Sequence, residues 1–266
     1  MRHSDSAPPL GFPDAVSSLS SSEPVRLIWR NDLDALTFEI GIGPSRRFVK
    51  WLPRRSGVVA ADEAARLRWA RAYISVPRLR STGGDAEATW IVTDPLPGHS
   101  AVAPRWQADP ATAVAAIGRG LRTMHDELPV DACPYSWSTD LRLAAVVHRA
   151  EAGLIEASQL HPEHRSLTVD QALSLATSPP PVDTLVVCHG DACAPNTLVD
   201  DDGSCTGHTD LGALGVADRW ADLAIATWSA TWNFGPGFED LLLGAYGVEP
   251  DPLRISYYRL LWDLEG

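Results

Sequence analysis

Short apolar runs alternate with polar turns in the first part of the chain, beginning at Val25. These runs are rich in β-branched and aromatic residues, and a Gly-Pro-Ser turn interrupts them at 43–45. Runs of this kind are typical of an antiparallel β-meander. Ala, Leu and Trp then recur at helical spacing over 61–74 before an apolar run returns to strand. The strands are predicted at 25–30, 36–42, 46–52 and 88–96.

Helical periodicity dominates after the Pro-Gly pair at 97 and 98. One stretch, 184–212, interrupts it with short strands around an Asp-Asp-Gly turn. We therefore predict an α+β fold with two lobes: an antiparallel sheet with one helix over 24–97, and a mainly helical lobe over 98–266. Residues 1–23 are rich in Ser, Pro and Gly, so we expect them to form a disordered tail. Helices are predicted near 110–126, 140–157 and 168–177, with more after 217.

The composition excludes several classes of protein. Hydrophobic residues make up 45% of the chain and charged residues 21%, which is a globular rather than a disordered composition. The net charge of −12 disfavours binding to nucleic acid or to an anionic membrane, and it favours a cationic ligand. An acidic surface also serves solubility alone, so charge by itself names no partner.

Cysteine usage and hydropathy bear on location. The four cysteines have neither CxxC spacing nor a secretory segment ahead of them, which indicates reduced thiols rather than disulfides or a zinc ribbon. The chain has no apolar run of the ~18 residues that a membrane span requires. We therefore expect a cytoplasmic protein.

The most specific chemical signal lies in the strand-rich interruption. Asp191 follows an apolar strand, Asn196 comes five residues later, and Asp210 ends the next strand. Phosphoryl transfer needs one carboxylate that orients an attacking hydroxyl and accepts its proton, and two oxygen ligands for Mg²⁺. Asp191 is the candidate base, and Asn196 and Asp210 are the candidate metal ligands. The spacing resembles that of a kinase catalytic loop followed by a metal-binding Asp-x-Gly.

A purely structural role is the alternative for each half of this pattern. The loop after Asp191 has the composition of a capped turn, and the Asp-Asp-Gly sequence is that of a hairpin turn. The two halves together, on adjacent strands, favour the catalytic interpretation. His189 is expected to support the loop from a buried position, because the carboxylate already fills the role of base.

Three segments carry a closer resemblance, namely HGDACAPNTLV, TDLGALGVADRWADLAIAT and YYRLLWDLE. They resemble the aminoglycoside 3′-phosphotransferases, antibiotic-resistance kinases with a protein-kinase-like fold. The similarity covers most of 25–266 and is densest from 185 to 227. It implies ATP or GTP as phosphoryl donor, Mg²⁺ as cofactor and direct transfer to a hydroxyl group of a cationic small molecule.

The resemblance also assigns residues to nucleotide binding. Lys50, at the end of a strand, resembles the lysine that grips the nucleotide phosphates, and Glu63 on the following helix is its expected ion-pair partner. Thr93, Asp94 and Leu96 resemble the hinge whose backbone binds the adenine edge. The turn at 31–35 departs from the family pattern, because it has two aspartates and no glycine near the expected phosphates.

The resemblance also implies substrate-binding residues, which this sequence matches less closely than the catalytic ones. Acidic side chains at the C-terminal end and in the helical lobe cup the amino groups of the drug in that family. Asp263, Glu265 and Glu163 match that role, and Arg219 matches a segment that follows the metal ligand.

Two rival functions remain open at this point. The first is a kinase of the same fold that acts on a macrolide, choline, a sugar or homoserine. The second is a non-catalytic nucleotide-binding protein, which would be expected to lack Asp191, Asn196, Asp210 or Lys50; all four are present. A P-loop kinase is excluded, because no GxxxxGK[ST] sequence occurs.

Overall fold

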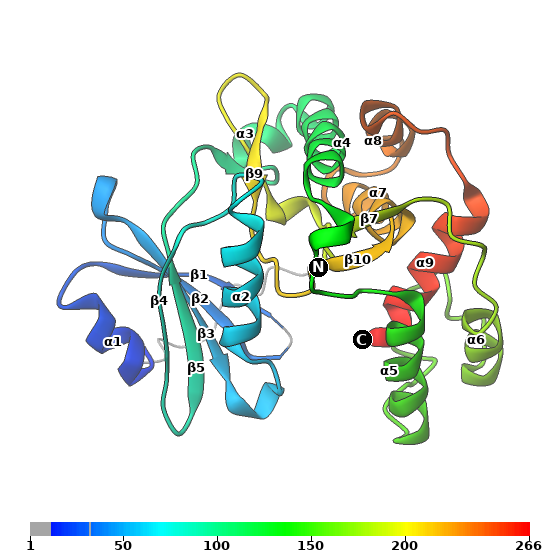
Figure 1. The fold of residues 1–266 in the computed structure, drawn as a ribbon, viewed down its shortest axis with the longest axis horizontal. Coiled ribbons are helices and arrows are strands. Elements are labelled where there is room, and N and C mark those ends of the chain that lie inside the picture. Colours follow the sequence, from blue (N-terminus) through cyan, green and yellow to red (C-terminus); the bar gives the residue numbers. More distant parts are fainter. Residues whose placement is uncertain (1–11, 32) are drawn as a thin grey trace. The chain divides into compact units, whose positions relative to one another are not determined.

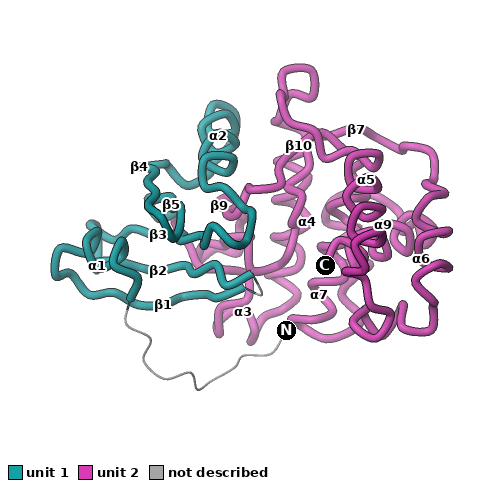
Figure 2. Tube along the Cα trace, turned by 90° about the horizontal axis from the view of Figure 1, so that it is seen from below, with its two compact units in different colours: residues 1–96 teal, residues 97–266 magenta. Residues whose placement is uncertain are grey.

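The computed structural model describes residues 12–31 and 33–266, and the chain divides into two compact units, 1–96 and 97–266. Figure 2 distinguishes the two units by colour. Among the described residues, no helix combines the length and the apolar character that a membrane crossing demands.

The first unit is built on a five-stranded antiparallel sheet with strand order β1-β2-β3-β5-β4 (Figure 1). Its elements are α1 (Asp14–Ser20), β1 (Val25–Arg30), β2 (Leu36–Ile40), η1 (Gly43–Ser45), β3 (Arg47–Pro53), η2 (Arg54–Ser56), α2 (Ala60–Ala70), β4 (Leu79–Gly84) and β5 (Ala88–Thr93).

Alternation along β3 decides which side chains face which helix. Val49 is buried with Val16 of α1 in one apolar cluster. Successive side chains of a strand point to opposite faces, so Lys50 lies on the other face, where it meets Glu63 of α2. The sequence period of two therefore places an ionic pair on one face of the sheet and an apolar core on the other.

The expected tail over 1–23 is wrong where the structure describes it. Residues 14–20 form α1, and Val16 is fully buried against the sheet. The reason is the pair of apolar residues Val16 and Leu19, three positions apart, which gives a short helix one apolar face despite its serines. Residues 1–11 lie outside the described residues.

The second unit is mainly helical and has two small antiparallel sheets, β10-β7 and β6-β8-β9 (Figure 1). Its core is one apolar cluster to which α4, α7 and α9 contribute most. Its elements are β6 (His99–Ser100), α3 (Pro104–Gln107), α4 (Pro110–Glu127), η3 (Val130–Ala132), α5 (Thr139–Glu151), α6 (Val169–Ala176), β7 (Leu185–Cys188), η4 (Ala194–Asn196), β8 (Thr197–Val199), β9 (Cys205–His208), β10 (Gly215–Asp218), α7 (Trp220–Phe234), α8 (Glu239–Tyr246) and α9 (Pro252–Glu265).

Local sequence signals set the ends of its long helices. Both α4 and α9 begin with an Asp-Pro pair, in which Asp109 or Asp251 accepts a backbone hydrogen bond of the first turn and proline occupies the first helical position.

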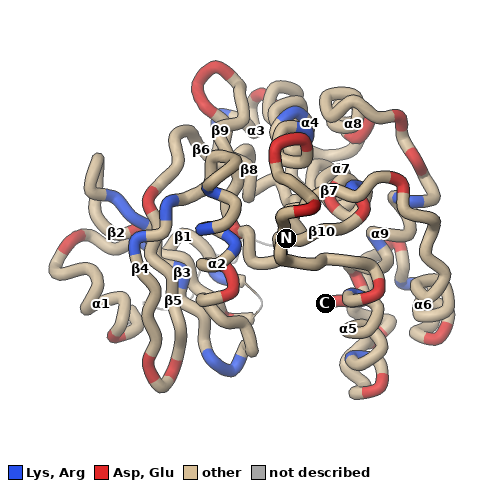
Figure 3. The backbone as a smooth tube through the Cα atoms, viewed as in Figure 1, with Lys and Arg blue, Asp and Glu red and all other residues tan. Residues whose placement is uncertain are grey.

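The turn between β8 and β9 carries three consecutive aspartates, visible in Figure 3 as an acidic tip. This hairpin brings residue 196 beside residues 209 and 210, which matters for the chemistry below.

Candidate active site

The loop that carries Asp191 leaves β7 through a turn that requires glycine. Gly190 has a φ of +83°, and a Cβ placed on it would lie 2.4 Å from the carbonyl oxygen of Ala213. Only glycine adopts this conformation and tolerates this approach without strain. The turn brings the chain from the buried strand to the half-buried Asp191.

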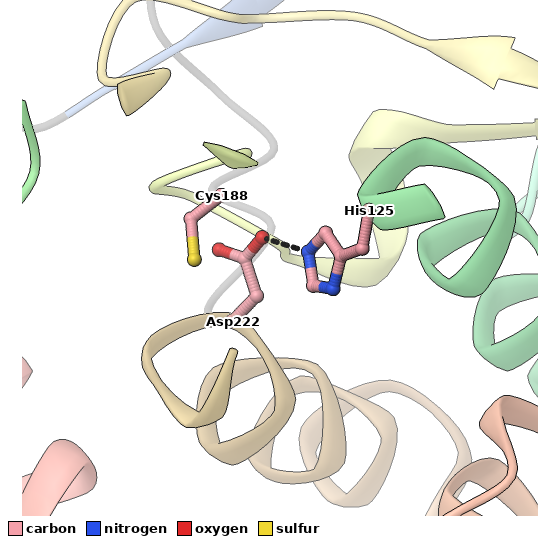
Figure 4. A group of neighbouring side chains, drawn as sticks. All are labelled: His125, Cys188 and Asp222. Atoms are coloured by element: carbon pink, nitrogen blue, oxygen red, sulfur yellow. Dashed lines mark hydrogen bonds and ion pairs between the residues drawn. The ribbon is translucent and has the colours of Figure 1, made fainter. Parts of the chain in front are cut away.

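A fully buried carboxylate on α7 holds the turn in place. Asp222 Oδ1 accepts a hydrogen bond from the backbone N–H of Gly190 at 2.9 Å, and Oδ2 accepts one from the N–H of His189 at 2.6 Å. The ring of His125 donates to the same Oδ2 at 3.0 Å (Figure 4). Burial raises the pKa of Asp222, but the His125 ring, His189 and the hydrogen bond from Gly190 together outweigh burial, so the pKa lies below its usual value.

The same region groups three potential metal ligands, His125, Cys188 and Asp222, all buried and within 4.8 Å of one another (Figure 4). Each already has protein partners: His125 Nδ1 lies 2.8 Å from the Tyr246 hydroxyl, and the Cys188 thiol donates to the carbonyl of Asp218. Burial also raises the pKa of Cys188 well above its ordinary value, which disfavours the thiolate that a metal needs. The group therefore acts as an anchor and not as a metal centre.

Two backbone neighbours fix the tautomer of His189. Its Nε2 lies 2.9 Å from the carbonyl oxygen of Thr209, so Nε2 carries the proton and donates it. Its Nδ1 accepts from the backbone N–H of Asp191 at 3.2 Å. A neutral ring with both nitrogens occupied is a structural brace, which agrees with the supporting role expected for His189.

Asp191 and Asn196 are brought together by the loop. Asn196 Nδ2 donates to the Asp191 carboxylate at 3.1 Å and to the Asp191 carbonyl at 3.0 Å. Using the amide nitrogen in this way leaves the amide oxygen as the ligand atom of Asn196. The amide of Asn196 thereby orients the carboxylate of Asp191.

The β8–β9 hairpin brings the residue before Asp210 into contact with Asn196. The N–H of Thr209 donates to the carbonyl of Asn196 at 2.9 Å, so Asp210 follows directly on a residue that contacts Asn196. Asp210 adopts a left-handed φ of +62°, a conformation that aspartate tolerates better than most residues. Oxygen atoms from a carboxylate and an amide are the donors that Mg²⁺ prefers, so this set fits the expected cation.

The residues predicted to hold the nucleotide lie in the first unit. Lys50 Nζ is 2.8 Å from Glu63 Oε2, and Glu63 is buried, so the expected ion pair is present. Asp94 pairs with Arg78 and Arg80, while its backbone N–H donates to the carbonyl of Arg78. Thr93 is buried at the end of β5, and Leu96 is half-buried.

The glycine-free turn between β1 and β2 is closed by a side chain. Asn31 Oδ1 accepts hydrogen bonds from the N–H groups of Leu33 and Ala35. Asp34 forms ion pairs with Arg30 and Arg55, which lower its pKa, chiefly through the hydrogen bond from Arg55. These arginines offset the negative charge of Asp34 beside the expected phosphate region.

The predicted substrate residues all have partners within the chain. Asp263 accepts hydrogen bonds from the His161 N–H and from the His164 ring, and Glu265 forms a bidentate pair with the buried Arg142 at 2.7 Å. The two others are Glu163, 3.8 Å from Arg259, and Arg219, 2.6 Å from Asp183.

The sequence interpretation missed the anchor as such. Asp222 lies in the segment TDLGALGVADRWADLAIAT, which carries the family resemblance, but the sequence pattern predicts no buried contact of Asp222 with His125 or Tyr246. The available signal was a histidine on the apolar face of α4, four residues after the buried Leu121.

Asp222→Asn tests the anchor. The variant replaces one acceptor oxygen with an NH₂ group that faces N–H donors, so unfolding free energy should fall by about 2–4 kcal/mol near neutral pH. Because the folded pKa of Asp222 lies below its usual value, the stability it adds is present above about pH 4 and is lost as pH falls further. Urea unfolding at pH 7 and at pH values below 4 measures both effects. The exposed Asp126→Asn on α4 is the control, and equal stability of the two variants would refute the anchor.

Glu265→Gln separates a structural role from a substrate role. Arg142 is only 2% exposed, so removing its charged partner should cost about 3 kcal/mol of stability. A thermal melt compares this variant with Glu163→Gln, whose carboxylate is 40% exposed and should change stability by less than about 0.5 kcal/mol. An unchanged melt for Glu265→Gln would show that the pair does not support the fold.

Comparisons with known proteins identify the family of this chain. A family model described as "Phosphotransferase enzyme family" matches residues 27–258. An aminoglycoside 3′-phosphotransferase of Streptomyces fradiae is 36% identical over 246 residues, which are 86% of this chain and 91% of that protein.

Solved structures extend the match to the fold. The crystal structure of an aminoglycoside-3′-phosphotransferase of type VIII has a TM-score of 0.78 at 30% identity, covering 94% of this chain and 98% of the other. An aminoglycoside phosphotransferase of Streptomyces rimosus in complex with ADP and streptomycin shares the fold, with a TM-score of 0.71 at 24% identity over 89% of this chain and 94% of its own. The chain belongs to the phosphotransferase enzyme family, alongside the aminoglycoside 3′-phosphotransferases.

Proposed function

We propose that this phosphotransferase moves the γ-phosphoryl group of ATP or GTP onto a hydroxyl group of an aminoglycoside, with Asp191 as the base. The observation that carries the proposal is the loop around Asp191: Asn196 orients its carboxylate, while His189 is held as a neutral brace. The similarity to aminoglycoside 3′-phosphotransferases supports this acceptor. The neighbour that contains ADP and streptomycin supports a nucleotide donor.

Asp191 is proposed to orient the acceptor hydroxyl and to take its proton as the new O–P bond forms. The bond between the γ-phosphorus and the bridging oxygen breaks in the same step, and the nucleoside diphosphate leaves with its electron pair. His189 is unsuited to this role, because its Nε2 proton is donated to Thr209 and its Nδ1 already accepts a hydrogen bond. Transfer is direct and needs no covalent enzyme intermediate.

Lys50 is proposed to hold the α- and β-phosphates, with Glu63 fixing its flexible stem. The ion pair of 2.8 Å restricts the ammonium group to one position, which reduces the entropy lost when phosphate binds. Backbone groups of Thr93, Asp94 and Leu96 are proposed to border the adenine. The N–H of Asp94 is already used by Arg78, so carbonyl oxygens carry more of that contact.

Asn196 and Asp210 are proposed to hold Mg²⁺. Their donor atoms are an amide oxygen and a carboxylate, and the hairpin keeps the two residues next to each other in the fold. The bound cation supplies positive charge against the phosphate oxygens. Asn196 then has two tasks, since its amide nitrogen orients Asp191 and its amide oxygen faces the metal.

The cytoplasm is the proposed location. All four cysteines are free, and two of them, Cys188 and Cys193, are buried thiols with pKa values raised well above the ordinary value, chiefly by burial. Such thiols are typical of a reducing compartment. The nucleotide donor is consistent with the same place.

A product assay tests the proposed function. The purified chain, ATP or GTP and Mg²⁺ are incubated with a panel of aminoglycosides, neutral sugars, choline and a macrolide, and mass spectrometry detects the added phosphoryl group. We expect phosphorylated aminoglycoside, with NMR of the product locating the modified hydroxyl. Transfer only to a non-aminoglycoside alcohol would contradict the acceptor assignment, and no transfer to any alcohol would contradict the activity.

Asp210→Ala tests the metal assignment. Removing this carboxylate takes away an anionic ligand that Mg²⁺ strongly favours, so kcat should fall by at least about 10³-fold, and a large excess of Mg²⁺ should restore little activity. The neighbouring Asp202→Ala, on the exposed turn of the same hairpin, is the matched control and should behave like wild type. Near-normal turnover of Asp210→Ala would show that the ligand lies elsewhere.

A further inference from the structure

Four aromatic rings from three parts of the second unit pack into one cluster, called here the aromatic wall. Trp228 and Trp232 lie one turn apart on α7, with ring centroids separated by 4.8 Å. Trp262 of α9 lies 5.8 Å from Trp232, and His161, from the segment before α6, lies 4.3 Å from Trp228. The wall thus joins segments that are distant in sequence on one face of the α7–α9 pair.

The aromatic wall adjoins the proposed base through a single side chain. Cys193, two residues after Asp191, is buried in the same apolar cluster as Trp228, with Trp232 and Trp262 packed against it. The pKa of the Cys193 thiol is raised well above its usual value by burial first and then by the carboxylate of Asp191. Cys193 therefore touches the wall on one side and borders Asp191 on the other.

Burial divides the wall into a floor and a rim. Trp228 is only 3% exposed and forms the floor. Trp232, Trp262 and His161 are half-buried, so they form the more exposed part of the cluster. Large aromatic side chains that remain partly exposed next to a reactive group are typical of ligand-binding surfaces, whereas a purely structural cluster would bury them.

Two of the three carboxylates expected to bind amino groups have strong partners within the chain. Asp263 accepts hydrogen bonds from His161 and His164, and Glu265 neutralises the buried Arg142. A cationic acceptor would have to share either carboxylate with these partners. Indole faces attract cations without such a competition, because the ring quadrupole places negative charge over the face.

We propose that Trp232 and Trp262, with His161, form the acceptor-binding wall and determine specificity for a hydroxylated organic cation that lays a ring face or an alkylated ammonium group on the indoles. The proposal rests on the proposed function and deepens it. Recognition by cation–π contact and stacking replaces much of the recognition that carboxylates would give.

The charge of His161 is compatible with this role. Burial is the main cause that lowers the pKa of His161 below its ordinary value, so the ring is neutral at pH 7. The groups around it are Asp263, Glu163, His164 and Arg165. A neutral imidazole extends the aromatic surface without repelling a cation.

Steady-state kinetics of Trp232→Leu and Trp262→Leu test the proposal. Leucine keeps apolar volume in the cluster but removes the indole face, so KM for the acceptor should rise about 3- to 30-fold in each variant. Both kcat and KM for the nucleotide should stay within about twofold of wild type, because neither tryptophan is placed in the catalytic machinery. Trp232→Phe and Trp262→Phe retain an aromatic face and should give intermediate values of acceptor KM.

Trp29→Leu is the matched control, because Trp29 is also partly exposed but lies on β1 of the first unit. The acceptor is the alcohol of the panel above that wild type uses best. If both leucine variants turn over aminoglycosides with unchanged acceptor KM, the proposed role of the aromatic wall is wrong and the proposed function stands. If wild type does not phosphorylate aminoglycosides, the proposed function is wrong. The variants are then compared on the alcohol that wild type does use, and an unchanged KM for that alcohol shows that the aromatic wall does not bind the acceptor.

Discussion

The buried carboxylate of Asp222 is the interaction on which the site depends. It accepts hydrogen bonds from the backbone of His189 and Gly190 and from the ring of His125. An unpaired charge at this depth would cost several kcal/mol, so the carboxylate is tolerable only while all three donors are in place. The helix α7 and the loop that carries Asp191 therefore adopt their arrangement together. Figure 4 shows how closely the His125 ring approaches this carboxylate.

The consequences of that anchor extend along the loop. With its backbone fixed, His189 spans from the Asp191 N–H to the carbonyl of Thr209 and so joins the loop to the strand that precedes Asp210. Asn196 completes the connection by bonding both the carboxylate and the carbonyl of Asp191. Asp191, Asn196 and Thr209, the residue before Asp210, thus belong to one hydrogen-bonded network. Preorganisation of this kind lowers a reaction barrier because little rearrangement remains when the substrates bind.

Local patterns in the sequence predicted much of this fold. The strand predicted at 25–30 is β1, and the helix predicted at 110–126 is α4, because alternation and helical spacing are local properties. The helix predicted at 140–157 ends at Glu151, since Gly153 takes a left-handed φ of +67°. The edge strand β4 was missed because its Leu-Arg-Ser-Thr-Gly-Gly sequence is largely polar and exposed. The proposed roles of Asp191, Asn196 and Asp210 come from their spacing in the sequence. The contact between His125 and Asp222 joins residues 97 positions apart and leaves no local pattern.

The most direct test of the central claim is kcat for Asp191→Asn, measured beside a thermal melt and a titration with Mg²⁺-nucleotide. Asparagine keeps the shape of the side chain and an oxygen that accepts from Asn196, but it lacks the anionic oxygen that takes the proton. The account predicts that kcat falls by about 10²- to 10⁴-fold, while melting temperature and nucleotide affinity stay near those of wild type. Undiminished kcat, with stability lowered by about 1 kcal/mol, would contradict it and would show that Asp191 only caps a turn.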